Sequence, residues 1–143
     1  MTRAGNLHAV RGRLWVRIAA ALAVIFGLAT IREGGAVLLG DEQARQAAGQ
    51  YVPFVLWFNA LTGFAYVAAG IGLWLQKRWA AGLAIAIAAA TLAVFAAFGA
   101  HVASGGAYEQ RTVIAMSLRS AVWLGIALFA WRLIRAPNGR ASP

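Results

Sequence analysis

Four long apolar segments constrain what this 143-residue chain can fold into. Each is close to the ~20 residues that a helix needs to cross the ~30 Å hydrocarbon core of a bilayer. Because bare backbone polar groups are costly in hydrocarbon, each segment is predicted to be a helix. The predicted fold is all-α, an integral-membrane bundle of four transmembrane helices that forms a single membrane domain over residues 1–143. These helices are expected at about 14–31 (or 14–39), 53–75, 79–102 and 112–134.

The sequence does not decide where the first helix ends. If the helix continues to about Leu39, Arg32 and Glu33 lie within the bundle, whereas an end at Thr30 puts them at the membrane interface. The pair Gly34-Gly35 is compatible with a break or with a close packing point.

Composition supports the membrane assignment. Hydrophobic residues make up 62% of the chain and charged residues only 12%, whereas a soluble domain has about 25% charged residues. The absence of cysteine excludes disulfides, iron–sulfur clusters and thiolate zinc sites. The net charge of +9 comes from basic residues at the ends of the apolar segments, a pattern typical of membrane anchoring. We therefore expect membrane lipids as partners and no nucleic acid.

The connections between the apolar segments differ in length. Gln76 to Arg78 form a tight turn, so the second and third helices are predicted to be antiparallel neighbours. A short loop with Gly105-Gly106 joins the third and fourth. The longer segment 32–52 holds a predicted short surface helix, EQARQAA, which Asp41 caps and Gly49 ends.

Charge predicts the orientation of the bundle. With four crossings, both termini share a side with the turn at Gln76–Arg78. Lys and Arg favour the cytoplasm, so both termini are predicted to be cytoplasmic, in a multi-pass protein of the bacterial inner membrane. The termini side carries nine basic residues and no acid: Arg3, Arg11, Arg13, Arg17, Lys77, Arg78, Arg132, Arg135 and Arg140.

The alternative interpretation of the first segment is a cleaved signal peptide. It has a basic start and an apolar centre, as signal peptides do. However, no small-x-small cleavage site follows before Arg32-Glu33, so the segment is predicted to remain a membrane helix.

Polar residues are predicted to converge on the outward side. At 1.5 Å per residue, Arg119 lies ~10 Å and Asn59 ~9 Å inside their helix ends. Polar groups in hydrocarbon turn toward the bundle interior, because exposing a charge there costs at least ~2.5 kcal/mol. We therefore expect an outward-facing polar cup that binds a ligand. Its predicted residues are Arg32, Glu33, Asn59, His101, Glu109, Arg111 and Arg119, with Tyr66 below them.

Three roles are open for Arg119. It could extend along its own helix to the outer headgroups, form a structural ion pair with Glu33 or Glu109, or bind an anionic ligand or lipid headgroup. His101 is equally compatible with a hydrogen bond at the end of its helix, and Glu109 with Arg111 could be only an exposed loop pair.

Other features predict packing and membrane anchoring. Gly63, Gly70 and Gly72 are expected where helices approach closely. Five tryptophans near helix ends are typical of an aromatic belt at the membrane interface, namely Trp15, Trp57, Trp74, Trp79 and Trp131, whereas Trp123 lies mid-helix.

The sequence offers few candidates for catalytic residues or metal ligands. Only one histidine lies near the cup, and with Met116 and one carboxylate it falls short of a typical transition-metal set. No metal site is predicted, and the same count excludes a bis-histidine haem within one chain. No nucleophile–base pair or phosphate loop is present, so catalytic residues are unassigned and the chain is not predicted to be an enzyme on its own.

Three features resemble the DoxX-like family of small four-helix membrane proteins. They are the stretch AAGIGLWLQKRWAAGLA, His101 at the end of the third helix, and GGAYE before the fourth. The resemblance covers about residues 54–133 and implies the four-helix fold and an association with membrane redox complexes, including thiosulfate:quinone oxidoreductase subunits. Family members often carry an acid in the second helix, where this chain has Tyr66-Val67-Ala68.

Three functions follow as alternatives. The first is an accessory membrane subunit without a cofactor of its own, whose cup binds a lipid or quinone headgroup or a partner protein. The second is a quinone-linked redox component that works with a partner protein. The third is a small-anion transporter, which would need a homo-oligomer because four helices leave little room for a pore.

Overall fold

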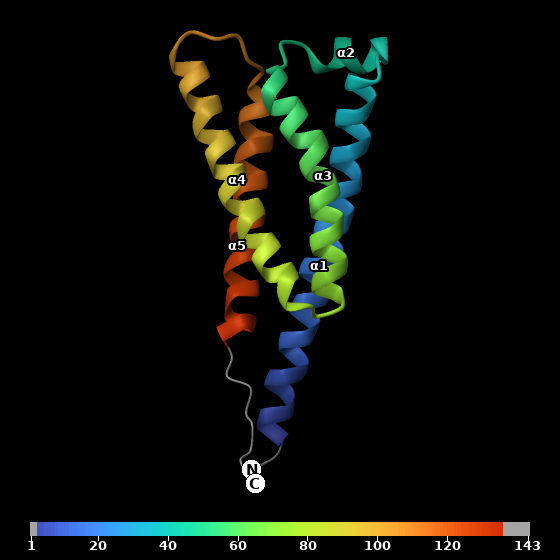
Figure 1. The fold of residues 1–143 in the computed structure, drawn as a ribbon, viewed down its shortest axis with the longest axis vertical. Coiled ribbons are helices and arrows are strands. Elements are labelled where there is room, and N and C mark those ends of the chain that lie inside the picture. Colours follow the sequence, from blue (N-terminus) through green and yellow to red (C-terminus); the bar gives the residue numbers. More distant parts are fainter. Residues whose placement is uncertain (1–2, 136–143) are drawn as a thin grey trace.

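The computed structural model describes the backbone of residues 3–135 and the side chains of residues 12–132. Within these residues the chain is all-helical, as predicted (Figure 1). Four of the helices are long and apolar enough to cross a membrane. The helices are α1 (Arg3–Leu38), α2 (Glu42–Ala48), α3 (Pro53–Trp74), α4 (Arg78–Ala103) and α5 (Gln110–Arg135).

The first helix is longer than predicted. It begins at Arg3 instead of residue 14, because the prediction followed the apolar run, whereas the polar residues before that run contain no proline to end the helix. It continues to Leu38, which resolves the open alternative in favour of the long form. Gly34 is a packing point, since a Cβ there would lie 3.0 Å from the Cβ of Ala60 on α3.

The short helix α2 forms where the sequence predicts it. The Asp41 side chain accepts a hydrogen bond from the backbone N–H of Ala44 at 3.1 Å and so caps the first turn. Gly49 ends the helix with a φ of 62°, a conformation that residues with a Cβ rarely adopt. Both ends of α2 are therefore set by local sequence.

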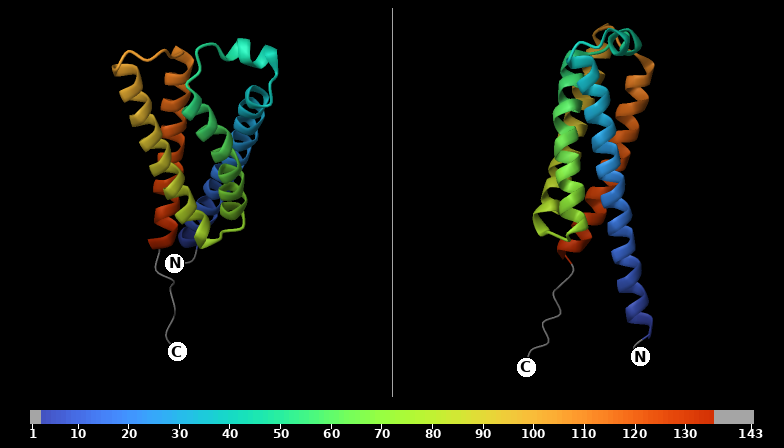
Figure 2. Two further views of the ribbon diagram at one scale, coloured as in Figure 1. Left: turned by 45° about the horizontal axis from the view of Figure 1, so that its top comes forward. Right: turned by 90° about the vertical axis from the view of Figure 1, so that its right-hand side faces the viewer.

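The long helices form two closely packed pairs. α1 packs along α3 and α4 along α5, and a tight turn at Leu75–Lys77 joins α3 to α4. α3 and α4 meet at this turn and diverge toward the opposite end of the molecule, where α2 lies (Figures 1 and 2). α1 and α5 touch at few points. The start of α1 and the end of α5 lie at the same end as the α3–α4 turn (Figure 1).

Small residues allow the close packing of α1 on α3. A Cβ at Gly70 would lie 2.7 Å from Val24 Cγ2 and 2.8 Å from the carbonyl oxygen of Ala20. Gly63 approaches Ile31 in the same way. The predicted role of these glycines is confirmed, and Gly72 likewise packs against the first turn of α4.

Two buried clusters hold the bundle together. The larger one joins all four long helices around Tyr66 and Trp123, whose ring centroids lie 4.6 Å apart. The smaller one joins α3, α4 and α5 nearer to α2 and centres on Phe98 and Met116. The space between α1 and α5 near α2 belongs to neither cluster.

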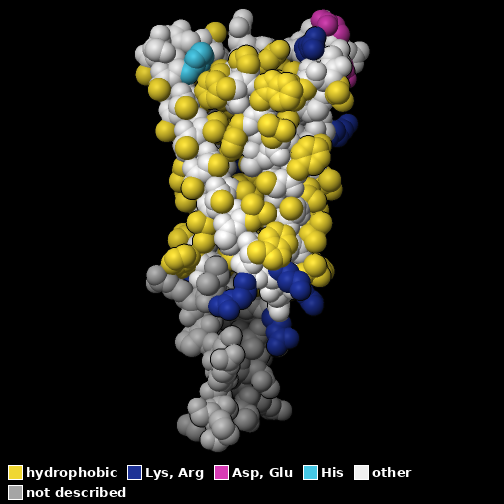
Figure 3. All heavy atoms as spheres, viewed as in Figure 1, with side chains coloured by type: hydrophobic (Ala, Val, Ile, Leu, Met, Phe, Trp, Pro, Cys, Tyr) yellow, Lys and Arg dark blue, Asp and Glu magenta, His cyan; other side chains and the backbone are white. Residues whose placement is uncertain are grey.

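The surface separates apolar and charged residues along the long axis. On the face shown in Figure 3, hydrophobic side chains cover the flank of the bundle, Lys and Arg gather at the end of the α3–α4 turn, and Asp and Glu appear at the α2 end. The five tryptophans predicted to form a belt are exposed, whereas Trp123 is fully buried.

Candidate functional site

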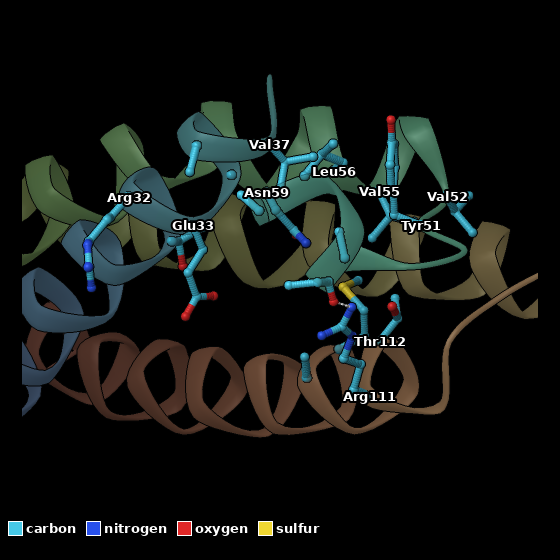
Figure 4. Close-up of a pocket in the computed structure, with 18 of the residues that line it drawn as sticks. Arg32, Glu33, Val37, Tyr51, Val52, Val55, Leu56, Asn59, Arg111 and Thr112 are labelled. Atoms are coloured by element: carbon cyan, nitrogen blue, oxygen red, sulfur yellow. Dashed lines mark hydrogen bonds between the residues drawn. The ribbon is translucent and has the colours of Figure 1, made fainter. Parts of the chain in front are cut away.

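A cavity of about 690 Å³ lies between α1, α3 and α5 beneath α2 (Figure 4). Residues of α4 do not contribute to its walls. The apolar part of the wall includes Val37, Val55 and Leu56. Its polar residues include five of those predicted from the sequence, together with Thr30: they are Thr30, Arg32, Glu33, Asn59, Arg111 and Arg119.

Arg119 is the buried charge of this cavity, with only 7% of its surface exposed. Counted from the helix ends, Arg119 on α5 lies ~13 Å deep and Thr30 on α1 ~12 Å deep, so the two side chains meet at one level. Arg119 Nη2 donates to Thr30 Oγ1 at 3.4 Å, and Nη1 contacts Met116 Sδ at 3.9 Å. Arg119 Nε has no hydrogen-bond partner among the described residues.

Aromatic rings supply the remaining contacts of the guanidinium. Its central carbon lies 5.6 Å from the ring centroid of Phe26 and 6.0 Å from that of Tyr66. A cation over an aromatic face contributes ~0.5–2 kcal/mol, which offsets only part of the cost of burying the charge. The site therefore holds a cation that the protein stabilises incompletely.

These contacts bear on the three roles open for Arg119. Neither Glu33 nor Glu109 lies within ion-pair distance of its guanidinium, and Glu109 is engaged elsewhere, so neither predicted ion pair is formed. The side chain does not extend to the surface either, because it bonds Thr30 on the neighbouring helix. The ligand-binding role is compatible with this geometry and stays a hypothesis.

Glu33 and Asn59 point into the space between the helices, from α1 and α3 respectively (Figure 4). Glu33 and its neighbour Arg32 are exposed, whereas the side-chain oxygen of Asn59 is buried and has no hydrogen-bond partner among the described residues. The Asn59 amide and the Arg119 guanidinium together provide donors from two helices to a group bound between them.

α2 covers the cavity at the end of the bundle opposite the α3–α4 turn (Figure 1). Ala44, Ala47 and Ala48 of α2 contribute to the wall. Arg45 Nε donates to the carbonyl oxygen of Val37 at 3.1 Å, and Arg111 donates to that of Ala47. The sequence predicts the short helix and the polar cup as separate features. In the structure α2 lies over the cavity that five of the predicted cup residues line.

The remaining predicted site residues lie outside the cavity wall. A ring nitrogen of His101 lies 3.2 Å from the carbonyl oxygen of Ala107, and the ring packs edge-on against Phe54. Glu109 Oε1 accepts a hydrogen bond from the backbone N–H of Gln50 at 2.9 Å. His101 therefore closes the α4–α5 loop, and Glu109 fastens the segment that follows α2.

Tyr66 lies below Arg119 in the main core and is fully buried against Trp123. Sequence reasoning missed Thr30 as a site residue. A usable signal was present, because Thr30, Glu33 and Val37 follow 3-4 spacing and so share one face of α1.

Comparison with known protein families, with curated proteins and with solved structures finds no match to this sequence. Among residues 12–132, no three histidine or carboxylate side chains are grouped closely enough to hold a metal ion.

Proposed function

We propose that this chain is a multi-pass protein of the bacterial inner membrane whose cavity binds the polar head of a membrane amphiphile. The termini face the cytoplasm and the cavity lies in the outer half of the bundle. The chain itself carries out no chemistry and acts as an accessory subunit of a membrane complex or of a homo-oligomer. Four long apolar helices and the concentration of Lys and Arg at one end support the membrane placement.

The buried, unpaired Arg119 is the observation that carries the proposal. Arginine stays charged and offers five donors in a planar fork. In the structure its donors reach a hydroxyl and a thioether at long distances, and Nε reaches no partner. A ligand oxygen in the cavity would complete these hydrogen bonds and offset the buried charge.

The shape of the cavity favours a ligand that comes from the bilayer. α2 covers the outer end, where a water-soluble ligand would arrive, whereas α1 and α5 touch at few points along the side. The wall combines Val37, Val55 and Leu56 with the polar groups around Arg119. This arrangement suits an amphiphile whose head reaches Arg119 and whose tail leaves between α1 and α5.

Charge indicates the class of head group. The wall carries three arginines, Arg32, Arg111 and Arg119, against two acids, Glu33 and Asp41. The resulting excess of positive charge favours an anionic head or one rich in carbonyl oxygens. A quinone meets the second description, and the resemblance to DoxX-like proteins favours it as the specific ligand of a redox complex.

The experiment is a comparison of ligand content between Arg119→Lys and a matched control. Lysine keeps the charge but loses the planar fork. Arg132→Lys makes the same change at an exposed position outside the cavity. Each protein is purified in mild detergent, and the co-purifying small molecules are extracted and identified by mass spectrometry.

We expect one amphiphile to be retained by the parent and by Arg132→Lys and lost from Arg119→Lys, with all three proteins folded by circular dichroism. Equal amphiphile content in the parent and in Arg119→Lys would overturn the proposal.

A further inference from the structure

A second, smaller cavity of about 390 Å³ lies at the opposite end of the bundle. Its walls come from α1, from the α3–α4 turn and from the start of α4. Arg13, Lys77 and Arg78 supply three cations, and Gln76 adds an amide. The site shares no residue with the cavity around Arg119.

Backbone geometry brings these cations together. Gln76 has a φ of 53°, and the N–H of Lys77 donates to the carbonyl oxygen of Gly72 at 2.8 Å. The chain therefore reverses within a few residues, which places Lys77 and Arg78 side by side at the end of α3. α1 packs along α3 and passes this turn, so that Arg13 reaches the same cavity.

No acidic side chain of the described residues lies in the wall of this cavity. All four acids of the chain, Glu33, Asp41, Glu42 and Glu109, lie in or beside the α2 end. The side chains of Arg13, Lys77 and Arg78 have no hydrogen bond or ion pair to another described residue, whereas neighbouring Arg17 lies over the Trp74 ring at 5.6 Å. Three unpaired cations around one cavity repel one another, and an anion between them would offset this repulsion.

The floor of the cavity and the level at which it lies indicate what kind of anion would bind. Val16, Leu73 and Ala81 form an apolar floor beneath the cations. Trp15, Trp74 and Trp79 are exposed at the same level of the helices. Exposed tryptophans mark the headgroup region of a membrane, where lipid phosphates lie above the first apolar carbons.

We propose that this cavity binds the phosphate of an anionic phospholipid in the leaflet on the side of the termini. The guanidinium groups of Arg13 and Arg78 and the ammonium of Lys77 surround the phosphate. The apolar floor contacts the glycerol and the first acyl carbons. An acidic protein segment would meet the cations but would leave the apolar floor and the tryptophan level unexplained.

The test measures lipid retention by native mass spectrometry of the full chain, released from nanodiscs of equal parts phosphatidylglycerol and phosphatidylcholine. The variants are Arg13→Gln, Lys77→Gln and the double variant Lys77→Gln with Arg78→Gln. Arg132→Gln is the matched control, because it removes one exposed cation outside the cavity.

Each single variant should lower the ratio of bound phosphatidylglycerol to phosphatidylcholine about fivefold, since a basic residue near an anionic surface contributes ~1 kcal/mol. The double variant should lower it about 25-fold on the same basis, and the control should change it little. A uniform decrease that includes Arg132→Gln would overturn the proposal, because it would reflect net charge alone.

Two further measurements distinguish other anions. Inorganic phosphate at millimolar concentration should not displace bound phosphatidylglycerol, and displacement would indicate a site for the free anion. Retention that is unchanged in the double variant would overturn the proposal and would leave these cations to an acidic protein partner. Arg119→Lys should not alter this retention, so the result is independent of the function proposed for the outer cavity.

Discussion

Arg119 on α5 donates a hydrogen bond from Nη2 to Thr30 Oγ1 on α1, 3.4 Å away. The two helices otherwise touch at few points, so this bond is one of the few links between them beside the cavity. It joins residues that are 89 positions apart in the chain and about equally deep in the bundle.

Thr30→Val should remove this bond with almost no change in shape. Hydrogen bonds to charged groups contribute ~1.5–3 kcal/mol, and because this one is long, the expected loss lies below that range, at about 1 kcal/mol. The measurement is thermal unfolding in detergent. Thr112→Val is the control, because Thr112 also lies in the cavity wall but does not bond Arg119. An equal loss in both variants would mean that the Thr30–Arg119 bond contributes nothing specific.

Arg119→Met should raise the free energy of unfolding by about 1 kcal/mol relative to the parent. An arginine at the centre of a membrane helix costs at least ~2.5 kcal/mol, so removing it stabilises the fold. The loss of its bond to Thr30 and of its aromatic contacts offsets part of this gain. No carboxylate is left unpaired by the change, since neither Glu33 nor Glu109 pairs with Arg119. A large loss of thermal stability would instead indicate a structural role for the guanidinium.

The sequence predicts the local elements of this fold well. Apolar length predicts the four long helices, and the cap at Asp41 with the stop at Gly49 predicts α2. These features depend on residues that are neighbours in the chain. The start of α1 at Arg3 was not predicted, because that part of the helix is polar and lies outside the apolar run.

The arrangement of the candidate site was harder to predict, because it depends on distant contacts. Depth and helical spacing placed Arg119, Asn59 and Glu33 near one another. They did not indicate that Glu109 bonds Gln50, 59 residues away, instead of Arg119. The position of α2 over the cavity depends on Arg45 and Arg111, whose backbone partners no periodicity identifies.

Gly70→Ala should destabilise the packing of α1 on α3. The added Cβ would lie 2.8 Å from the backbone oxygen of Ala20, which cannot move without shifting the helix. Overpacking of this kind costs ~1–3 kcal/mol. Gly82→Ala on α4 is the control, because a Cβ there would meet nothing within 4 Å and alanine favours a helix by up to ~1 kcal/mol. Thermal unfolding in detergent should therefore move in opposite directions for the two variants.

Glu109→Gln should loosen the segment that follows α2 without unfolding the bundle. The carboxylate accepts the N–H of Gln50, and a charged acceptor makes a hydrogen bond roughly twice as strong as a neutral one. Hydrogen–deuterium exchange should rise in residues 41–50 and stay unchanged in α3 and α5. Glu42→Gln is the comparison, because the Glu42 side chain accepts a hydrogen bond from Gln46 within α2 and from no other described residue. Exchange that rises equally in both variants would show that Glu109 does not anchor this segment.

The distribution of charges along the sequence predicts how the bundle is oriented in a membrane. Nine basic residues and no acid lie in the segments on the termini side, whereas four basic and four acidic residues lie on the other side. Since Lys and Arg are retained in the cytoplasm, reporter fusions at Gln76 and after Pro143 should read cytoplasmic and a fusion at Gly105 should read periplasmic. The fusion at Gln76 is the more decisive one, because it lies between two helices that the tight turn holds antiparallel. A periplasmic reading there would invert the bundle, placing the cavity around Arg119 in the cytoplasmic half and the basic cavity at Arg13 in the outer leaflet.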